Sequence, residues 1–264
     1  MKTSYETILT EMVRPGLLLV TLNRPEVGNA KNTRMGRETL ALWTGLIADP
    51  GEVRAVVLTG AGGRIFCAGG DLKERNGMTQ PEWQAQHEIF ERSYAALLDC
   101  PVPVIAAVNG HAYGGGMEMV LACDFAYAAR TARLALTEVT LGIMPGAGGT
   151  QLLPRAVGER RAKEIILTGK PISAEQAYAW GIVNRLCEPE ALMSEALDTA
   201  ATIAANAPLS VRQAKKSMHV GLQLDLKSAL LFEIEAYNRL VPTEDRLEGV
   251  RAFNEKRKPD FKGR

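Results

Sequence analysis

Cysteine and histidine are scarce in this sequence and are scattered along it. The chain holds four cysteines and three histidines in 264 residues. The cysteines stand at Cys67, Cys100, Cys123 and Cys187, so none forms a CxxC pair and no histidine cluster accompanies them. This spacing is unlike that of zinc sites and disulfide scaffolds. We therefore expect buried, reduced thiols and no metal site.

Long apolar runs and an excess of one charge are also missing. No run approaches the ~20 apolar residues that span a bilayer, and residues 1–10 lack the apolar core of a signal peptide. The formal net charge is +1, which gives no overall basic field for nucleic acid. We therefore expect a cytoplasmic protein that binds neither membranes nor nucleic acid.

The order of apolar patterns predicts an α/β fold. Short apolar runs alternate with helical periodicity in the first two thirds of the chain, and helices dominate the rest. The predicted strands are residues 17–22, 55–58, 104–108, 124–128 and 134–136, and residues 66–72 are predicted to form a turn. The predicted helices are residues 33–48, 81–98, 117–123, 151–157, 161–167, 174–180, 189–205, 208–220, 224–240 and 244–256.

Two glycine-rich turns are the first candidates for a site. Gly114, Gly115 and Gly116 stand where a helix is expected to begin, in the stretch GHAYGGGMEMVLACD (residues 110–124). N–H groups at a helix start have no partner within the helix and suit an anion or a developing oxyanion. The turn AGGD (residues 68–71) offers further N–H groups. Tight helix–strand packing without a ligand explains such glycines equally well. The phosphate-loop and dinucleotide patterns are not met.

Two glutamates lie beside these small-residue segments. Glu118 follows the glycine triplet by two residues, and Glu138 stands in TEVTLGIMPGAGGTQ (residues 137–151). The chain has 30 acidic residues, and any one of them taken alone is best read as a solvated surface charge. The residues themselves therefore do not single out this pair.

Five collinear stretches provide the reason to select it. They are NRPEVGNA (residues 23–30), FCAGGDLKE (66–74), AAVNGHAYGGGMEMVLACD (106–124), LGIMPGAGGTQLLPRAVG (141–158) and AFNEKRKPDFKG (252–263). Together they resemble the crotonase, or enoyl-CoA hydratase, superfamily over nearly the whole chain. The stretches CAGGDLKE and PTEDRLEGVRAFNEKRKPDFKG are especially similar to 3-methylglutaconyl-CoA hydratases.

The resemblance implies a crotonase-like spiral of repeated ββα units over residues 1–206. It also implies a C-terminal helical region, residues 207–264, which builds homotrimers that often pair into hexamers. The substrate it implies is an acyl-CoA thioester. Because coenzyme A is part of that substrate, no separate cofactor is expected.

The resemblance also implies roles for individual residues. Glu118 and Glu138 become the catalytic acids and bases of a hydratase, which adds water to a 2-enoyl-CoA. The backbone N–H groups of Gly70 and Gly115 become the oxyanion hole. The residues implied to contact the acyl-CoA are Ala30, Ala68, Gly70, Asp71, Leu72, Lys73 and Gly115, with Phe253 and Lys256 reaching the nucleotide part from this or a neighbouring subunit.

Two other functions stay open at this point. The first is another crotonase-type reaction, chiefly that of an enoyl-CoA isomerase, because the fold hosts many chemistries. The second is RNA binding, since some 3-methylglutaconyl-CoA hydratase relatives use a lysine-rich helix for it. Here residues 31–54 hold only one lysine, Lys31, with three arginines. His111 follows no triad pattern, and we interpret it as structural.

Acyl-chain specificity is not readable from the sequence. We expect residues 76–93 and 142–146 to form the pocket wall. Two departures from the family pattern concern the same region. Lys31 places a charge where family members usually carry Leu or Met, and Gly70 replaces a commoner Ala before Asp71.

Overall fold

The computed structural model describes residues 5–264, so the first four residues of the predicted core region lie outside it. Within the described range a six-stranded sheet has the order β1-β2-β3-β5-β7-β10. Its strands are β1 (Ile8–Arg14), β2 (Leu17–Leu22), β3 (Ala55–Gly60), β5 (Val104–Val108), β7 (Phe125–Ala129) and β10 (Arg185–Cys187). Only the β1–β2 pair is antiparallel in this sheet.

Both faces of this sheet are covered by helices, which explains why its inner strands are continuous apolar runs. Along β2, Leu18 and Val20 face a core shared with α1 (Thr33–Ala48), α3 (Gln80–Leu98) and α4 (Gly115–Ala122). Leu17 faces the opposite side and packs in a second cluster with α8 (Leu192–Ala204). Alternation along the strand thus assigns each residue to one of two cores.

A second, smaller sheet within residues 5–264 carries the segments that later form the site. Its order is β4-β6-β8-β9. These strands are β4 (Ile65–Cys67), β6 (His111–Tyr113), β8 (Arg133–Ala135) and β9 (Ile172–Ser173). β4, β6 and β8 run parallel, whereas β9 is antiparallel to β8. The carboxyl ends of three strands therefore lie side by side.

Short helices connect and cover these sheets. They are η1 (Pro25–Val27), α2 (Leu72–Arg75), η2 (Glu138–Leu141), α5 (Gly149–Val157), α6 (Glu159–Thr168) and α7 (Ala174–Ala179). The longer helices begin at side-chain caps: Asn32 accepts a hydrogen bond from the Met35 N–H, and Thr79 forms a capping box with Glu82. Along residues 5–264, no helix is both long and apolar enough to cross a bilayer.

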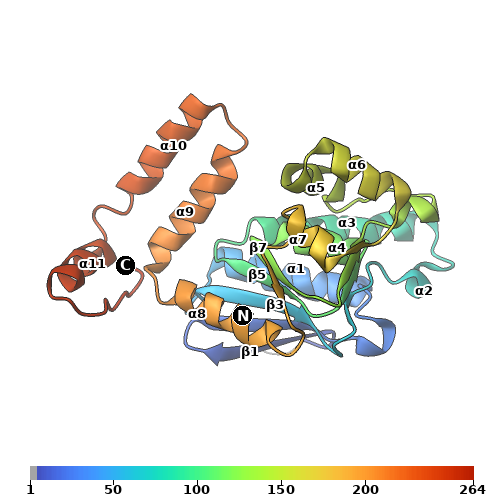
Figure 1. Ribbon diagram of the computed structural model, residues 1–264, viewed down its shortest axis with the longest axis horizontal. Coiled ribbons are helices and arrows are strands. Elements are labelled where there is room, and N and C mark those ends of the chain that lie inside the picture. Colours follow the sequence, from blue (N-terminus) through green and yellow to red (C-terminus); the bar gives the residue numbers. More distant parts are fainter. Residues whose placement is uncertain (1–4) are drawn as a thin grey trace.

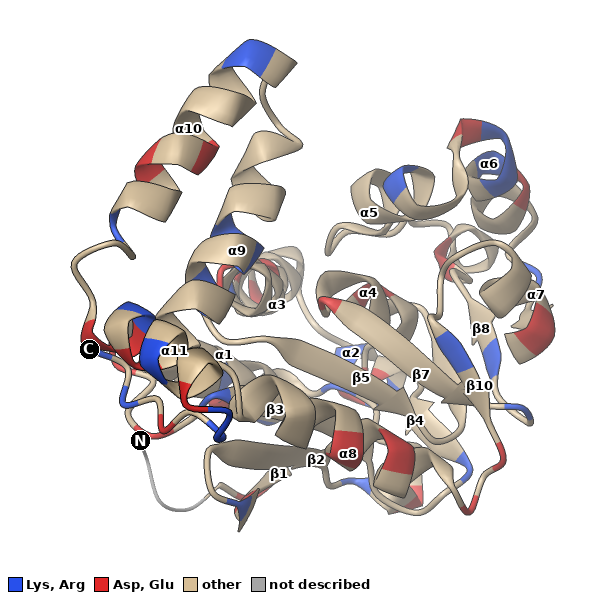
Figure 2. Ribbon diagram, turned by 60° about the vertical axis from the view of Figure 1, so that its left-hand side comes forward, with Lys and Arg blue, Asp and Glu red and all other residues tan. Residues whose placement is uncertain are grey.

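Three C-terminal helices extend from one end of the core (Figure 1). They are α9 (Pro208–Gly221), α10 (Leu226–Asn238) and α11 (Glu244–Asn254). α9 and α10 lie side by side, and most of their residues are neither acidic nor basic (Figure 2). The side chains of Leu222 and Leu226 are 84% and 75% exposed. The predicted division at 206/207 falls between α8 and α9 and stays a prediction as a domain boundary.

Most predicted elements coincide with the observed ones, and the missed strands are three very short ones and the edge strand β1. The strands at residues 17–22 and 104–108 have the predicted bounds. The predicted turn at 66–72 is wrong in its first part, because residues 65–67 form β4 and only residues 68–71 turn. β1, β6, β9 and β10 were not predicted. Each of the last three has at most three residues, too few for a periodic pattern to appear.

Candidate active site

Three turns meet at the carboxyl ends of β4, β6 and β8. β4 leads into the turn at residues 68–71, β6 into the glycine triplet, and β8 into η2, which begins at Glu138. The register pairs Cys67 with Ala112 and Tyr113 with Ala135. Because parallel strands end at the same edge, segments far apart in the sequence converge there. Ligands commonly bind at this edge of parallel sheets.

The two glycine turns touch each other. Gly69 has φ +93°, and a Cβ placed on it would lie 2.9 Å from the Tyr113 carbonyl oxygen and 3.2 Å from the Gly115 nitrogen. Gly114 has φ +53° and ψ −125°, a backbone conformation that L side chains rarely adopt. Glycine is therefore required at both positions, because the two turns approach each other too closely for side chains.

Gly115 and Gly116, the other two residues of the triplet, are glycine for different structural reasons. A Cβ on Gly116 would lie 2.1 Å from the Cys67 carbonyl oxygen, so Gly116 packs α4 against β4. Gly115 is the first residue of α4, and its N–H has no partner within the helix. The Tyr94 hydroxyl donates a 2.6 Å hydrogen bond to the Gly115 carbonyl oxygen. Tight packing and a free donor, which the sequence left as alternatives, thus both occur in one triplet.

Glu118 points from α4 to the start of α5. Its side chain is 3% exposed, and its Oε1 accepts 2.8 Å hydrogen bonds from the N–H groups of Ala147 and Gly149. Burial raises the pKa of Glu118, while the bonds from Gly149 and Ala147 oppose that rise. Two N–H donors on one oxygen favour the ionised carboxylate.

Glu138, at the start of η2, is buried like Glu118 but differs in its hydrogen-bond partners. Glu138 is 8% exposed, and its buried Oε2 has no hydrogen-bond partner in the described part of the chain. Burial raises the pKa of Glu138 to about 7, and the charge of Glu118 adds to the rise. A carboxyl group in such surroundings holds its proton near neutral pH. The two glutamates therefore differ: one is prepared to accept a proton and the other to donate one.

A cavity of about 460 Å³ connects these groups. Ala68, Gly70, Leu72 and Gly115 line it, as do both glutamates. The predicted pocket wall also appears: Trp83, His87 and Phe90 come from residues 76–93, and Ile143, Met144 and Gly146 come from residues 142–146. The volume is within the range of small-molecule sites.

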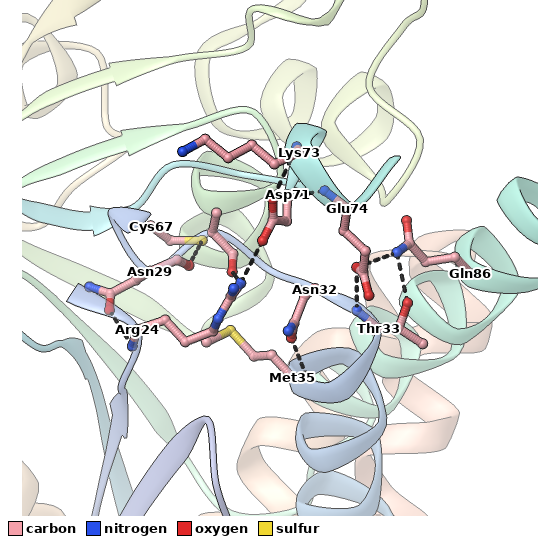
Figure 3. Close-up of polar contacts among 11 residues, drawn as sticks. Arg24, Asn29, Asn32, Thr33, Met35, Cys67, Asp71, Lys73, Glu74 and Gln86 are labelled. Carbon is pink, nitrogen blue, oxygen red and sulfur yellow. Dashed lines mark hydrogen bonds and ion pairs between the residues drawn. The ribbon is translucent and has the colours of Figure 1, made fainter. Parts of the chain in front are cut away.

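Three other predicted contact residues lie beside the cavity without lining it. The Asp71 side chain caps α2 and forms a 2.8 Å ion pair with Arg24 (Figure 3). Lys73 donates its backbone N–H to the same carboxylate at 3.1 Å. Arg24 also donates to the Ala30 carbonyl oxygen at 2.6 Å. These bonds hold the turn at residues 68–71 against residues 29–31.

The residues of the C-terminal helix that are predicted to reach the CoA nucleotide lie away from this cavity. Phe253 is 83% exposed and Lys256 is also exposed, and neither lines the cavity. α11 lies at the opposite end of the molecule from α2 (Figure 1). His111 does not line the cavity either: its Nδ1 accepts from the Arg133 N–H at 3.1 Å, in keeping with a structural role.

Several residues of the cavity were missed as site residues, among them the polar or charged Lys31, Arg75 and Tyr94. Lys31 has a signal in the sequence, because it places a charge where the resembling family usually has an apolar side chain. Arg75 and Tyr94 have none, since nothing in a helical pattern tells which of its residues meets a cavity formed by another part of the chain.

Comparisons with known proteins show the family to which the chain belongs. The family model described as enoyl-CoA hydratase/isomerase matches residues 13–264. The Bacillus subtilis protein YngF, which bears an enoyl-CoA hydratase/isomerase name, is 45% identical over 98% of this chain and 99% of its own. The short-chain-enoyl-CoA hydratase of Clostridium acetobutylicum is 42% identical over 93% of this chain and 94% of its own.

A solved structure shows the same fold. The crystal structure of an enoyl-CoA hydratase from Bacillus anthracis superposes with a TM-score of 0.96 at 43% identity. The match covers 98% of this chain and 100% of that one. This chain therefore belongs to the enoyl-CoA hydratase/isomerase family and has the α/β crotonase fold.

Proposed function

We propose that this protein is an enoyl-CoA hydratase, which adds water across the double bond of a 2-enoyl-CoA thioester. The observation that carries the proposal is the contrast between two buried glutamates on one cavity. Glu118 accepts two backbone hydrogen bonds on one oxygen, whereas Glu138 has a buried oxygen without a partner. Hydration needs a base for water and an acid for the α-carbon, and the pair supplies one of each.

The reaction runs through an enolate. The N–H groups of Gly70 and Gly115 bind the thioester oxygen, which makes the β-carbon electrophilic. Glu118 removes a proton from water while the water oxygen bonds to the β-carbon, and the electrons of the double bond move towards the thioester oxygen. Glu138 then gives its proton to the α-carbon. The product is a 3-hydroxyacyl-CoA, and proton exchange through solvent then releases the proton from Glu118 and returns one to Glu138.

The turns explain why a backbone oxyanion hole fits here. A Cβ on Gly69 would lie 3.2 Å from the Gly115 nitrogen, so the two turns lie close enough to supply one donor each to a single oxygen. Each such donor contributes ~10²–10³ in rate in enzymes where one has been removed. Each general acid or base contributes ~10²–10⁴.

Assembly and compartment form part of the same proposal. The C-terminal helices carry an apolar groove between α9 and α10, which contains Leu222, Leu226 and Leu230. The strongly exposed leucines along this groove fit a face that is covered by another subunit. We propose that it builds a homotrimer or a dimer of trimers, in which Phe253 and Lys256 reach the CoA nucleotide of a neighbouring subunit. We propose the cytoplasm as its compartment.

The test follows the ultraviolet absorbance of the enoyl thioester. Crotonyl-CoA and 3-methylglutaconyl-CoA are incubated with the wild type and with Glu138→Gln, the second substrate being chosen for the likeness of residues 67–74. The hydratase is supported if the wild type removes the absorbance and Glu138→Gln does so at a rate at least ~10²-fold lower. A 3-enoyl-CoA converted to a 2-enoyl-CoA, with neither substrate hydrated, supports an isomerase instead.

A further inference from the structure

Lys31 is a buried lysine on the wall of the acyl cavity. It is 2% exposed and lines the same cavity as Glu118 and Glu138. Its Nζ donates to the Ser93 hydroxyl at 3.0 Å, and no Asp or Glu of residues 5–264 forms an ion pair with it. Lysine is almost never fully buried unless an anion accompanies it. Burial lowers the pKa of Lys31 to about 7, an effect that the charge of Glu118 opposes, so an anion bound beside Nζ would hold the group in its charged form.

The neighbours of the ammonium group leave donors for a ligand. Ser93 is also hydrogen-bonded to the Thr39 hydroxyl at 2.8 Å, and Thr39 donates to the Met35 carbonyl oxygen at 2.7 Å. This short chain fixes the Ser93 oxygen as an acceptor for Lys31. One of the three ammonium hydrogens is used in this way, and two remain.

Aromatic rings hold the ammonium at the acyl end of the site. Lys31 Nζ lies 4.2 Å from the centroid of the Tyr94 ring, whose hydroxyl binds the carbonyl oxygen of Gly115. The Lys31 backbone N–H donates to the Gly69 carbonyl oxygen at 2.7 Å. Lys31 is therefore hydrogen-bonded to the first turn of the proposed oxyanion hole, and its ammonium group meets the second turn through Tyr94. This places Nζ beside the proposed position of the thioester.

A second cation shares the same wall. The Arg75 guanidinium carbon lies 5.5 Å from the centroid of the Phe90 ring, and Lys31 Nζ lies 5.2 Å from that centroid. Arg75 Nε donates to Gln86 at 2.7 Å, which leaves its terminal nitrogens available. A Cβ on Gly70 would lie 3.3 Å from this guanidinium, so the glycine there makes room for it. Both departures from the family pattern thus provide positive charge in one pocket.

We propose that Lys31 binds a carboxylate carried by the acyl chain, so that CoA thioesters of dicarboxylic acids are preferred over those with an alkyl end. The inference rests on the proposed acyl-CoA site but not on the reaction performed there. Arg75 adds attraction for the same group through its planar, always charged guanidinium. An alkyl end leaves Lys31 without an anion, and a site built to bind a polar group discriminates strongly against a substrate that lacks it.

The experiment compares binding of two saturated, unreactive thioesters, glutaryl-CoA and butyryl-CoA, which differ by one carboxylate. Dissociation constants are measured by calorimetry for the wild type, Lys31→Met, Lys31→Arg and the control Lys170→Met, which removes an exposed lysine outside the cavity. The wild type is expected to bind glutaryl-CoA ~10–10²-fold more tightly, in line with a hydrogen bond to a charged group. Lys31→Met abolishes most of that ratio, Lys31→Arg keeps part of it, and Lys170→Met keeps all of it.

Equal binding of the two thioesters by the wild type overturns the proposal, as does an unchanged ratio in Lys31→Met. The wild-type ratio needs no variant, so a Lys31→Met protein that fails to fold does not remove the test. The result also separates this inference from the proposed reaction. Lys31-dependent preference for glutaryl-CoA without hydration of any enoyl-CoA contradicts the hydratase alone. Hydration with no such preference contradicts the carboxylate site alone.

Discussion

Replacing Glu118 in two ways separates its chemical role from its structural one. In Glu118→Gln the amide oxygen still accepts the hydrogen bonds from Ala147 and Gly149, but the base is lost. We expect kcat/KM to fall ~10²–10⁴-fold, with little change in stability. In Glu118→Ala the two N–H groups lose their acceptor. An unsatisfied buried donor costs ~1–3 kcal/mol, so the loss is about 2 kcal/mol or more.

The assay pairs turnover with thermal unfolding. For a chain of this size, ~2 kcal/mol lowers Tm by roughly 4–8 °C. Glu118→Ala should therefore be both inactive and less stable, whereas Glu118→Gln should only be inactive. Glu164→Gln, on the exposed surface of α6, is the matched control. The reasoning is refuted if Glu118→Gln keeps more than a tenth of the wild-type kcat/KM, or if it unfolds at the same temperature as Glu118→Ala.

Three further predictions concern the pH, the packing and the assembly of the protein. The folded-state pKa of Glu138 is raised from 4.5 to about 7, so its contribution to stability is complete below pH 4.5 and is lost as pH rises through 7. Glu138→Gln should therefore gain Tm over the wild type at pH 8 and not at pH 4; an equal difference at both would contradict this. Gly116→Ala places a Cβ 2.1 Å from the Cys67 carbonyl oxygen, and we expect a loss of ~1–3 kcal/mol in denaturant unfolding, which a variant of wild-type stability would disprove. Leu226→Asp should reduce the molar mass measured by light scattering to that of a monomer while helix content is kept; unchanged mass would show that this face is not the interface.

Periodicity predicted the elements that have enough residues to be periodic. The strand at residues 17–22 and the helix at residues 33–48 were found with their observed bounds. β1 was missed because it is an edge strand with an outer face in water, and its sequence ILTEMVR mixes polar and apolar residues without strict alternation. β4 and β6 are three residues long, and only their pairing defines them as strands.

The site was predicted unevenly, and for physical reasons. Glu118 and Glu138 were selected by resemblance, and the structure brings both to one cavity. Lys31 and Tyr94 lie at positions whose environment is set by long-range packing: the lysine meets a ring that stands 63 positions further along the chain. No local pattern carries that information, because a side chain that crosses to another element leaves no period of its own.

The placement of the site on three short parallel strands has a consequence for how the molecule acquires activity. β4, β6 and β8 pair across separations of tens of residues, and each has only three residues. Such non-local pairs close large loops and form slowly compared with helices. The donors and the carboxylates come together only when all three strand ends are in register. Turnover is therefore a measure of the completed core, and recovered helix content after refolding does not show that an active site exists.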